Sequence, residues 1–86
     1  GLTSQMRRAA VSIPANLAEG YGRRHRGEYI QFVRIAFGSG TELETHLVIA
    51  QKIGFITPTE AIKVESLLNE VMRMLNRLSS SLVAKL

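Results

Sequence analysis

The chain has 86 residues, 45% of them hydrophobic, a formal net charge of +4 and no cysteine. This size allows one small domain over residues 1–86, and the lack of cysteine excludes a disulfide framework and a thiolate metal site. The lack of cysteine is compatible with the cytoplasm, where we expect the protein. No apolar run approaches the roughly 18–20 residues that cross a bilayer, so we expect no membrane partner. The apolar content is more than a small monomer hides easily, which favours self-association.

The first predicted helix covers residues 3–20. Apolar residues recur at three- and four-residue steps from Leu2 to Leu17, which is the spacing of one buried helix face. Gly20 is of the type that commonly follows the last helical residue. Pro14 lies inside this pattern and removes a backbone donor, so we expect it to kink the helix rather than to end it.

Short polar residues flank the proline. Ser12 and Asn16 can form hydrogen bonds with backbone groups that Pro14 frees. A structural role for Pro14 and Asn16 in a kinked packing helix is the simpler interpretation. A functional site at these three residues is the alternative.

The second predicted helix covers residues 27–53 and is apolar on several sides, as is typical of a central helix or one that faces another subunit. Gly38, Ser39 and Gly40 interrupt its middle, and each interior glycine costs about 1 kcal/mol relative to alanine. Either the helix breaks and restarts with Ser39 as N-cap and Glu42 in its first turn, or the glycines admit a close helix crossing. We expect one long helix with a local irregularity.

The third predicted helix covers residues 58–85 and has the clearest start. Gly54 ends the preceding helix, Thr57 is the N-cap, Pro58 is the first helical residue and Glu60 completes a capping box. A seam with alternating four- and three-residue steps follows it, at Val64, Leu68, Val71, Leu75, Leu78 and Leu82. This period is typical of helices that pack in an antiparallel bundle.

Three long helices joined by short connections, with no strand pattern, predict an all-α, up-down bundle. The second helix has apolar surface for a fourth helix. That helix would come either from an upstream segment missing from this chain or from a neighbouring subunit.

Few residues offer catalytic or metal chemistry. The chain contains no Asp or Cys, and its two histidines are His25 and His46. Glu42 and His46 are four residues apart on one helix, but a di-iron bundle needs a Glu-x-x-His pair on each of two helices. We therefore predict a non-enzymatic protein with no cofactor, no metal and no catalytic residues.

Glu42 and Glu44 lie among apolar residues of the second helix. A carboxylate that is partly buried needs a partner, and Arg7 and Arg8 on the first helix are the candidates. We expect a structural ion pair, with a catalytic carboxylate as the alternative.

Positive charge is concentrated early in the chain. Six arginines oppose two glutamates between Arg7 and Arg34, whereas the remaining residues carry no net charge. This asymmetry favours an anionic partner. The turn between the first two helices combines cationic side chains with tyrosines: Arg23, Arg24, His25, Arg26, Tyr21 and Tyr29.

Side chains that donate hydrogen bonds to phosphate, close to aromatic rings on which bases can stack, are typical of nucleic-acid contact. We therefore predict that this turn, together with Arg7 and Arg8, binds RNA or DNA. The simpler alternative is a solvated turn whose two tyrosines pack between helices.

Two segments, SQMRRAAVSIPANLAEG at residues 4–20 and GSGTELETHL at residues 38–47, resemble a known family. It is that of the bacterial four-helix-bundle proteins named after intervening sequences in 23S rRNA genes, which includes accessory variability proteins of diversity-generating retroelements. The resemblance covers residues 1 to about 56. It implies an antiparallel four-helix bundle whose first helix would lie upstream of Gly1, a homopentameric barrel and a basic nucleic-acid-binding accessory.

Residues that match the family motifs are Arg7 and Arg8 in the RR pair, Pro14, Asn16 and Glu19 in the IPxNxAEG part, and Glu42 and Glu44 in the ELET part. Gly40 departs from the bulkier residue usual there, which leaves the regularity of the mid-helix open. The favoured hypothesis is a non-enzymatic oligomer that contacts RNA or DNA. The alternative is a structural assembly or protein-interaction module that holds a reverse transcriptase or a ribosomal component.

Overall fold

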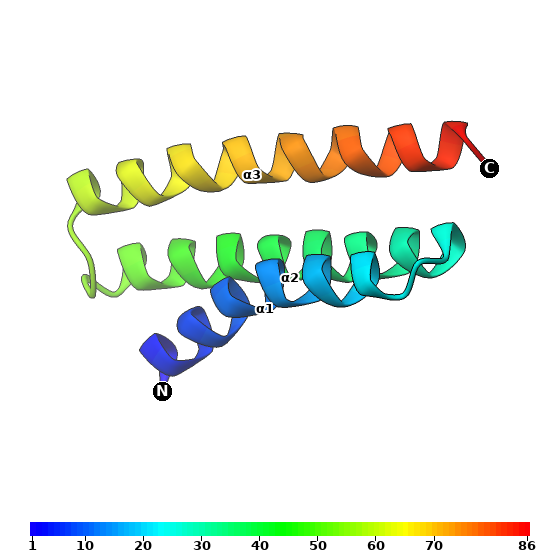
Figure 1. Cartoon of the computed structure of the whole chain (residues 1–86). Coiled ribbons are helices and arrows are strands. Elements are labelled where there is room, and N and C mark those ends of the chain that lie inside the picture. The colour runs from blue at the N-terminus through cyan, green and yellow to red at the C-terminus, as the bar shows by residue number, and fades with distance from the viewer.

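The computed structural model describes residues 1–86 as three α-helices with no strand: α1 (Leu2–Gly22), α2 (Arg26–Lys52) and α3 (Pro58–Ala84). The all-α prediction is confirmed, and each helix ends within two residues of its predicted limit. The chain reverses direction at both connections (Figure 1), and the molecule measures 45 × 22 × 13 Å along its principal axes. None of the three helices combines the length and apolar character that a membrane crossing requires.

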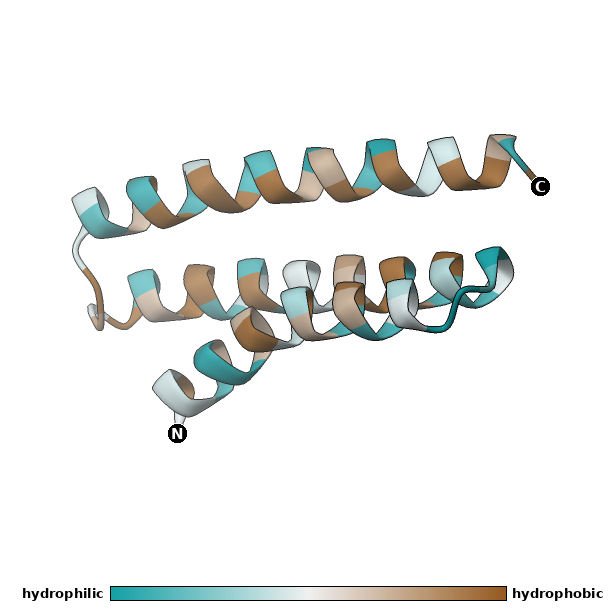
Figure 2. Cartoon of the chain, viewed as in Figure 1, coloured by the Kyte–Doolittle hydropathy of each residue, from teal (hydrophilic) through white to brown (hydrophobic).

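Helix α2 lies between the other two. It packs against α1 on one side and α3 on the other, whereas no Cα of α1 lies within 8 Å of a Cα of α3. Figure 2 shows that the hydrophobic side of α3 is turned toward α2. The buried core draws on all three helices: Ala9, Ile13, Val33, Ala36, Leu43, Leu68 and Leu75.

Pro14 lies inside α1, which continues to Gly22. Figure 1 shows α1 bending along its length, with its N-terminal part turned away from α2. The side-chain Nδ2 of Asn16 donates a hydrogen bond to the carbonyl oxygen of Ser12 at 2.7 Å, so a polar side chain bonds to the backbone beside the proline. The predicted kink is confirmed.

Gly20 does not end α1, contrary to our expectation. It is buried between α1 and α2, where an added Cβ would lie 2.6 Å from Cβ of Phe32 and 3.0 Å from Cδ1 of Tyr29. Because it has no side chain, α1 and α2 can approach closely at this point. In the connection that follows α1, the residue with a left-handed backbone is Arg24, whose φ is 57°.

Helix α2 runs without interruption through Gly38, Ser39 and Gly40, so the expected local irregularity is absent. Gly40 is buried, and an added Cβ would overlap the sulfur of Met72 on α3. The alternative of a close helix crossing is therefore correct. Ser39 lies inside the continuous helix and therefore does not cap one; its Oγ lies 2.8 Å from Oγ of Ser12 on α1.

Local signals account for the connection between α2 and α3. Gly54 has a φ of 74°, and the N–H groups of Gly54 and Phe55 donate to the carbonyls of Gln51 and Ala50 at 3.2 and 2.8 Å, as in a Schellman motif. At the start of α3, Oγ1 of Thr57 accepts from the Glu60 backbone N–H at 3.1 Å. The Thr57 N–H in turn donates to the Glu60 carboxylate at 2.8 Å, so the predicted capping box is confirmed.

Candidate nucleic-acid interface

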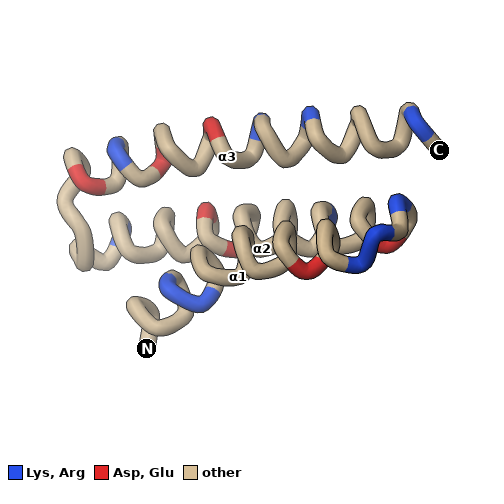
Figure 3. Tube along the Cα trace, viewed as in Figure 1, with Lys and Arg blue, Asp and Glu red and all other residues tan.

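Basic side chains gather at one end of the molecule. The connection between α1 and α2 lies at the same end as the C-terminal half of α3, and Figure 3 shows blue segments on both. The acidic segments of α3 lie in its other half. This end therefore draws positive charge from both halves of the sequence, including the half whose net charge is zero.

A pocket of about 720 Å³ opens at this basic end. Its lining comes from all three helices and the turn: Gly20, Tyr21, Gly22, Arg24, His25, Arg26, Tyr29, Leu82 and Lys85. The volume lies within the range of natural ligand pockets. Three of the four basic turn residues predicted to bind nucleic acid, Arg24, His25 and Arg26, are thus brought together.

Lys85 is a further cationic residue of this pocket. Nothing local in the sequence marks it, because it lies near the C-terminal end of α3, far along the chain from the turn. The available signal is the up-down order of the helices. In that order the third helix runs antiparallel to the second, so its end lies near the start of the second.

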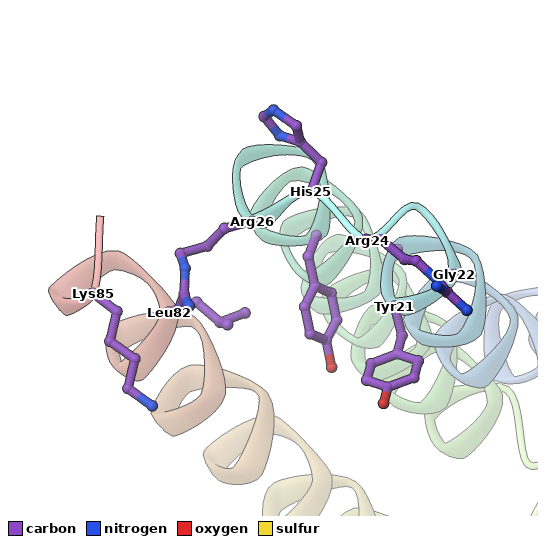
Figure 4. Close-up of a pocket in the computed structure, with 9 residues that line it drawn as sticks. Tyr21, Gly22, Arg24, His25, Arg26, Leu82 and Lys85 are labelled. Carbon is purple, nitrogen blue, oxygen red and sulfur yellow. The ribbon is translucent and has the colours of Figure 1, made fainter.

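The side chains of the pocket point in different directions (Figure 4). Arg26 reaches from the start of α2 toward Leu82 on α3, on the same side as Lys85. Arg24 turns toward Gly22 and Tyr21, on the side of α1, and the His25 ring points away from the other labelled side chains. Cations therefore stand on both walls, and neither Arg24 nor Arg26 has an ion-pair partner.

Arg23 differs from its neighbours in the turn. Its Nε lies 3.1 Å from Oε2 of Glu19, and its Nη1 lies 3.7 Å from Oε2 of Glu28. Its guanidinium carbon also lies 5.2 Å from the centre of the Phe32 ring. These contacts tie the turn to both helices, and Arg23 does not line the pocket.

The two tyrosines have different environments. Their ring centroids are 5.9 Å apart and their planes meet at 78°, an edge-to-face contact. Tyr29 is half-buried and packs against the core, as the packing alternative expects. Tyr21 is 74% exposed, so helix packing does not account for its ring.

Arg7 and Arg8 lie in a separate place. They are exposed on α1, about 20 Å from the turn at a rise of roughly 1.5 Å per residue. Figure 3 shows the corresponding blue segment of α1 toward its N-terminus, away from the basic end. The structure does not bring these two arginines to the predicted site.

The predicted ion pair between these arginines and Glu42 or Glu44 is wrong. Glu42 points from the outer side of α2, with its side chain 54% exposed, and its Oε1 lies 3.4 Å from Nε2 of His46. Glu44 forms no ion pair. Glu42 is exposed and Glu44 only partly buried, so solvent reaches both carboxylates without an arginine partner.

The residues around Pro14 form a contact between helices. Oγ of Ser12 accepts a hydrogen bond from Nδ2 of Asn16 at 2.9 Å and also bonds to Ser39 on α2. Pro14 itself is exposed. This arrangement favours the structural role predicted for Pro14 and Asn16.

Glu42 and His46 gather no further metal ligand. Nδ1 of His46 is buried without a hydrogen-bond partner, but no group of three or more His, Cys, Asp or Glu side chains that could hold a metal ion occurs in the chain.

A family model described as "23S rRNA-intervening sequence protein" matches residues 1–77. The match includes α1, α2 and most of α3, and so extends past the residues that carry the resemblance in the sequence. A comparison with curated proteins finds no match.

Proposed function

The chain belongs to the 23S rRNA-intervening sequence protein family, and from this membership and its basic end we propose that it is a non-enzymatic accessory protein that binds RNA or DNA. The observation that carries the proposal is the convergence of Arg24, Arg26 and Lys85 on one pocket. These side chains come from two distant parts of the chain, the α1–α2 turn and the C-terminal end of α3, and none has an acidic partner.

Unpaired cations at one end of a small protein attract a polyanion. Phosphate contacts supply most of the affinity of sequence-independent binding, since each one releases condensed counterions from the nucleic acid. Three contacts give weak binding at moderate salt. Repeating the basic end in an oligomer would multiply them into useful avidity.

We further propose that the complete fold is an antiparallel four-helix bundle. Both α1 and α3 pack on α2 without approaching each other, which leaves room for a helix that contacts both. On α3, Leu67 and Met74 are 64% and 59% exposed, as expected of residues that such a helix covers. The family resemblance supports a first helix upstream of Gly1 in this position.

The same resemblance supports a homopentamer, and the lack of cysteine is compatible with a place in the cytoplasm. Exposed apolar side chains on α2 favour contact between copies, among them Ile35, Val48 and Ile49. They equally favour the second candidate function, a structural assembly or interaction module without nucleic-acid contact. Its partner would then be a reverse transcriptase or a ribosomal component.

Binding measured across a salt series separates the two candidates. Fluorescence anisotropy with mixed-sequence RNA and DNA should show affinity that falls steeply with salt. Replacing Arg24 and Arg26 together by alanine should reduce the slope of log K against log salt by about 1.4 to 1.8. The matched control replaces Arg7 and Arg8, which lie elsewhere. Absence of binding at low salt would favour the interaction module.

A further inference from the structure

We propose that the outer face of α3, made by Arg73, Asn76, Arg77 and Ser80, is a second phosphate-binding surface that holds the backbone of a nucleic-acid duplex. The inference rests on the proposed function and adds to it a site apart from the basic end. This face lies on the side of α3 that neither α2 nor the proposed upstream helix covers.

The packed side of α3 is its leucine seam, where Leu75 is buried and Leu78 packs against the core. Since a helix turns by about 100° per residue, Arg73 lies roughly 170° around α3 from the midpoint of these two leucines. Asn76 and Arg77 lie on either side of Arg73, each about 130° from that midpoint. All three are exposed, so the outer face of α3 points away from the core.

The proposed upstream helix would cover a different part of α3. It would lie over Leu67 and Met74, which are 64% and 59% exposed. On the same helical count, Asn76 and Arg73 lie about 160° and 100° around α3 from Met74, so they point away from that helix. Arg77, about 60° from Met74, lies at the border of the free face, where a long side chain keeps its guanidinium in water.

The side chains of the outer face are of the kinds that donate to phosphate oxygens. A hollow on this face is lined by Arg73, Asn76, Arg77 and Ser80, with no hydrophobic residue among them. Asn76 also lines a neighbouring hollow between α3 and α2, to which α2 contributes Arg34. None of these three arginines forms an ion pair, so their charge is available to an anion.

A duplex is the occupant that these side chains fit. Protein–DNA interfaces are more polar and more positively charged than interfaces between proteins, and two arginines, an asparagine and a serine match that composition. The hollow has no aromatic ring on which an unpaired base could stack. Arg73 and Arg77 are four residues apart, about one helical turn, so they present charge along the helix axis to a row of phosphates.

The experiment measures binding of an end-labelled, mixed-sequence DNA duplex by anisotropy across a salt series. The test variant combines Arg73→Ala and Arg77→Ala. The matched control combines Lys52→Ala and Lys63→Ala, which removes the same charge near the connection between α2 and α3. Because the four side chains are exposed, circular dichroism should show that both variants keep their helices.

We expect the double arginine variant to bind the duplex roughly tenfold more weakly and to reduce the slope of log K against log salt by about 1.8. The double lysine variant should keep the wild-type slope. Asn76→Ala should lower the affinity roughly threefold at an unchanged slope, because it removes a hydrogen-bond donor and no charge. Unlabelled duplex should displace the probe from the wild type, whereas poly-glutamate at equal charge should not.

Equal slopes of the arginine and lysine variants would overturn the second surface. The proposed function would still hold if joint replacement of Arg24 and Arg26 reduced the slope. Equal displacement of the probe by duplex and poly-glutamate would assign the outer face of α3 to an acidic protein and would also overturn the inference. Absence of wild-type binding to duplex and single strands at low salt would instead contradict the proposed function.

Discussion

Oγ of Ser12 lies 2.8 Å from Oγ of Ser39, and this hydrogen bond joins α1 to the middle of α2. On α1 it lies beside the proline kink, since Asn16 donates to both the carbonyl and the hydroxyl of Ser12. On α2 it lies between two glycines that leave the helix intact. One polar contact thus connects the two sequence features that interrupt otherwise regular helix patterns.

This contact predicts a measurable loss of stability. Ser39→Ala should lower the free energy of unfolding by about 1 kcal/mol, because it leaves the half-buried Ser12 hydroxyl without one partner. Ser66→Ala on the exposed surface of α3 is the control, since it gains the same helix propensity and breaks no contact between helices. The free energies of unfolding are measured with urea. Equal stability of Ser39→Ala and Ser66→Ala would contradict this prediction.

The two glycines near the end of α1 should respond oppositely to alanine. Gly20→Ala forces Cβ against Phe32 and Tyr29 and should cost about 1–3 kcal/mol of stability. Gly22→Ala meets no atom within 4 Å and should gain about 0.5–1 kcal/mol from helix propensity. Thermal unfolding of the pair tests this, and a stabilised Gly20→Ala would show that α1 and α2 are not in close contact there.

Arg24 combines a strained backbone with an unpaired charge. Since its φ is 57°, Arg24→Gly should relieve the strain and raise the free energy of unfolding by about 1 kcal/mol. The same change should weaken RNA binding, because it removes a pocket cation. Arg24→Ala separates the effects, since it loses the charge and keeps the strain. Stronger binding by the glycine variant would contradict the assigned role.

The capping box predicts part of the acid sensitivity. The Thr57 backbone N–H donates to the Glu60 carboxylate and lowers the pKa of that carboxyl below its usual 4.5. Glu60 therefore contributes stability that is complete above pH 4.5 and is lost as the pH falls through its lowered pKa. Glu60→Gln should flatten the decline of stability in this range, whereas Glu65→Gln should not. Identical acid unfolding of wild type and Glu60→Gln would refute this.

Features governed by neighbouring residues could be predicted from the sequence. The capping box at Thr57 and the left-handed Gly54 each depend on hydrogen bonds between residues a few positions apart. The continuation of α1 through Pro14 was also predictable, because the apolar spacing persists on both sides of it.

Features governed by contacts between helices were less accessible. Gly20 resembles a helix end in sequence, and only its position against Phe32 reveals a packing role. In the sequence, Arg23 is of the same type as its basic neighbours, and only the fold shows that it forms ion pairs with Glu19 and Glu28. Lys85 lies at the candidate site only because α3 runs antiparallel to α2 and ends beside the turn.

Lys85 provides the most direct test of the central claim, which is that the fold assembles a nucleic-acid-binding end from distant parts of the chain. Lys85→Ala and Lys63→Ala remove the same charge from opposite ends of α3, and only Lys85 lines the pocket. Measured by anisotropy with single-stranded RNA over a salt series, Lys85→Ala should weaken binding and reduce the salt slope by about 0.7, while Lys63→Ala should match the wild type. Equal effects of the two substitutions would contradict the claim.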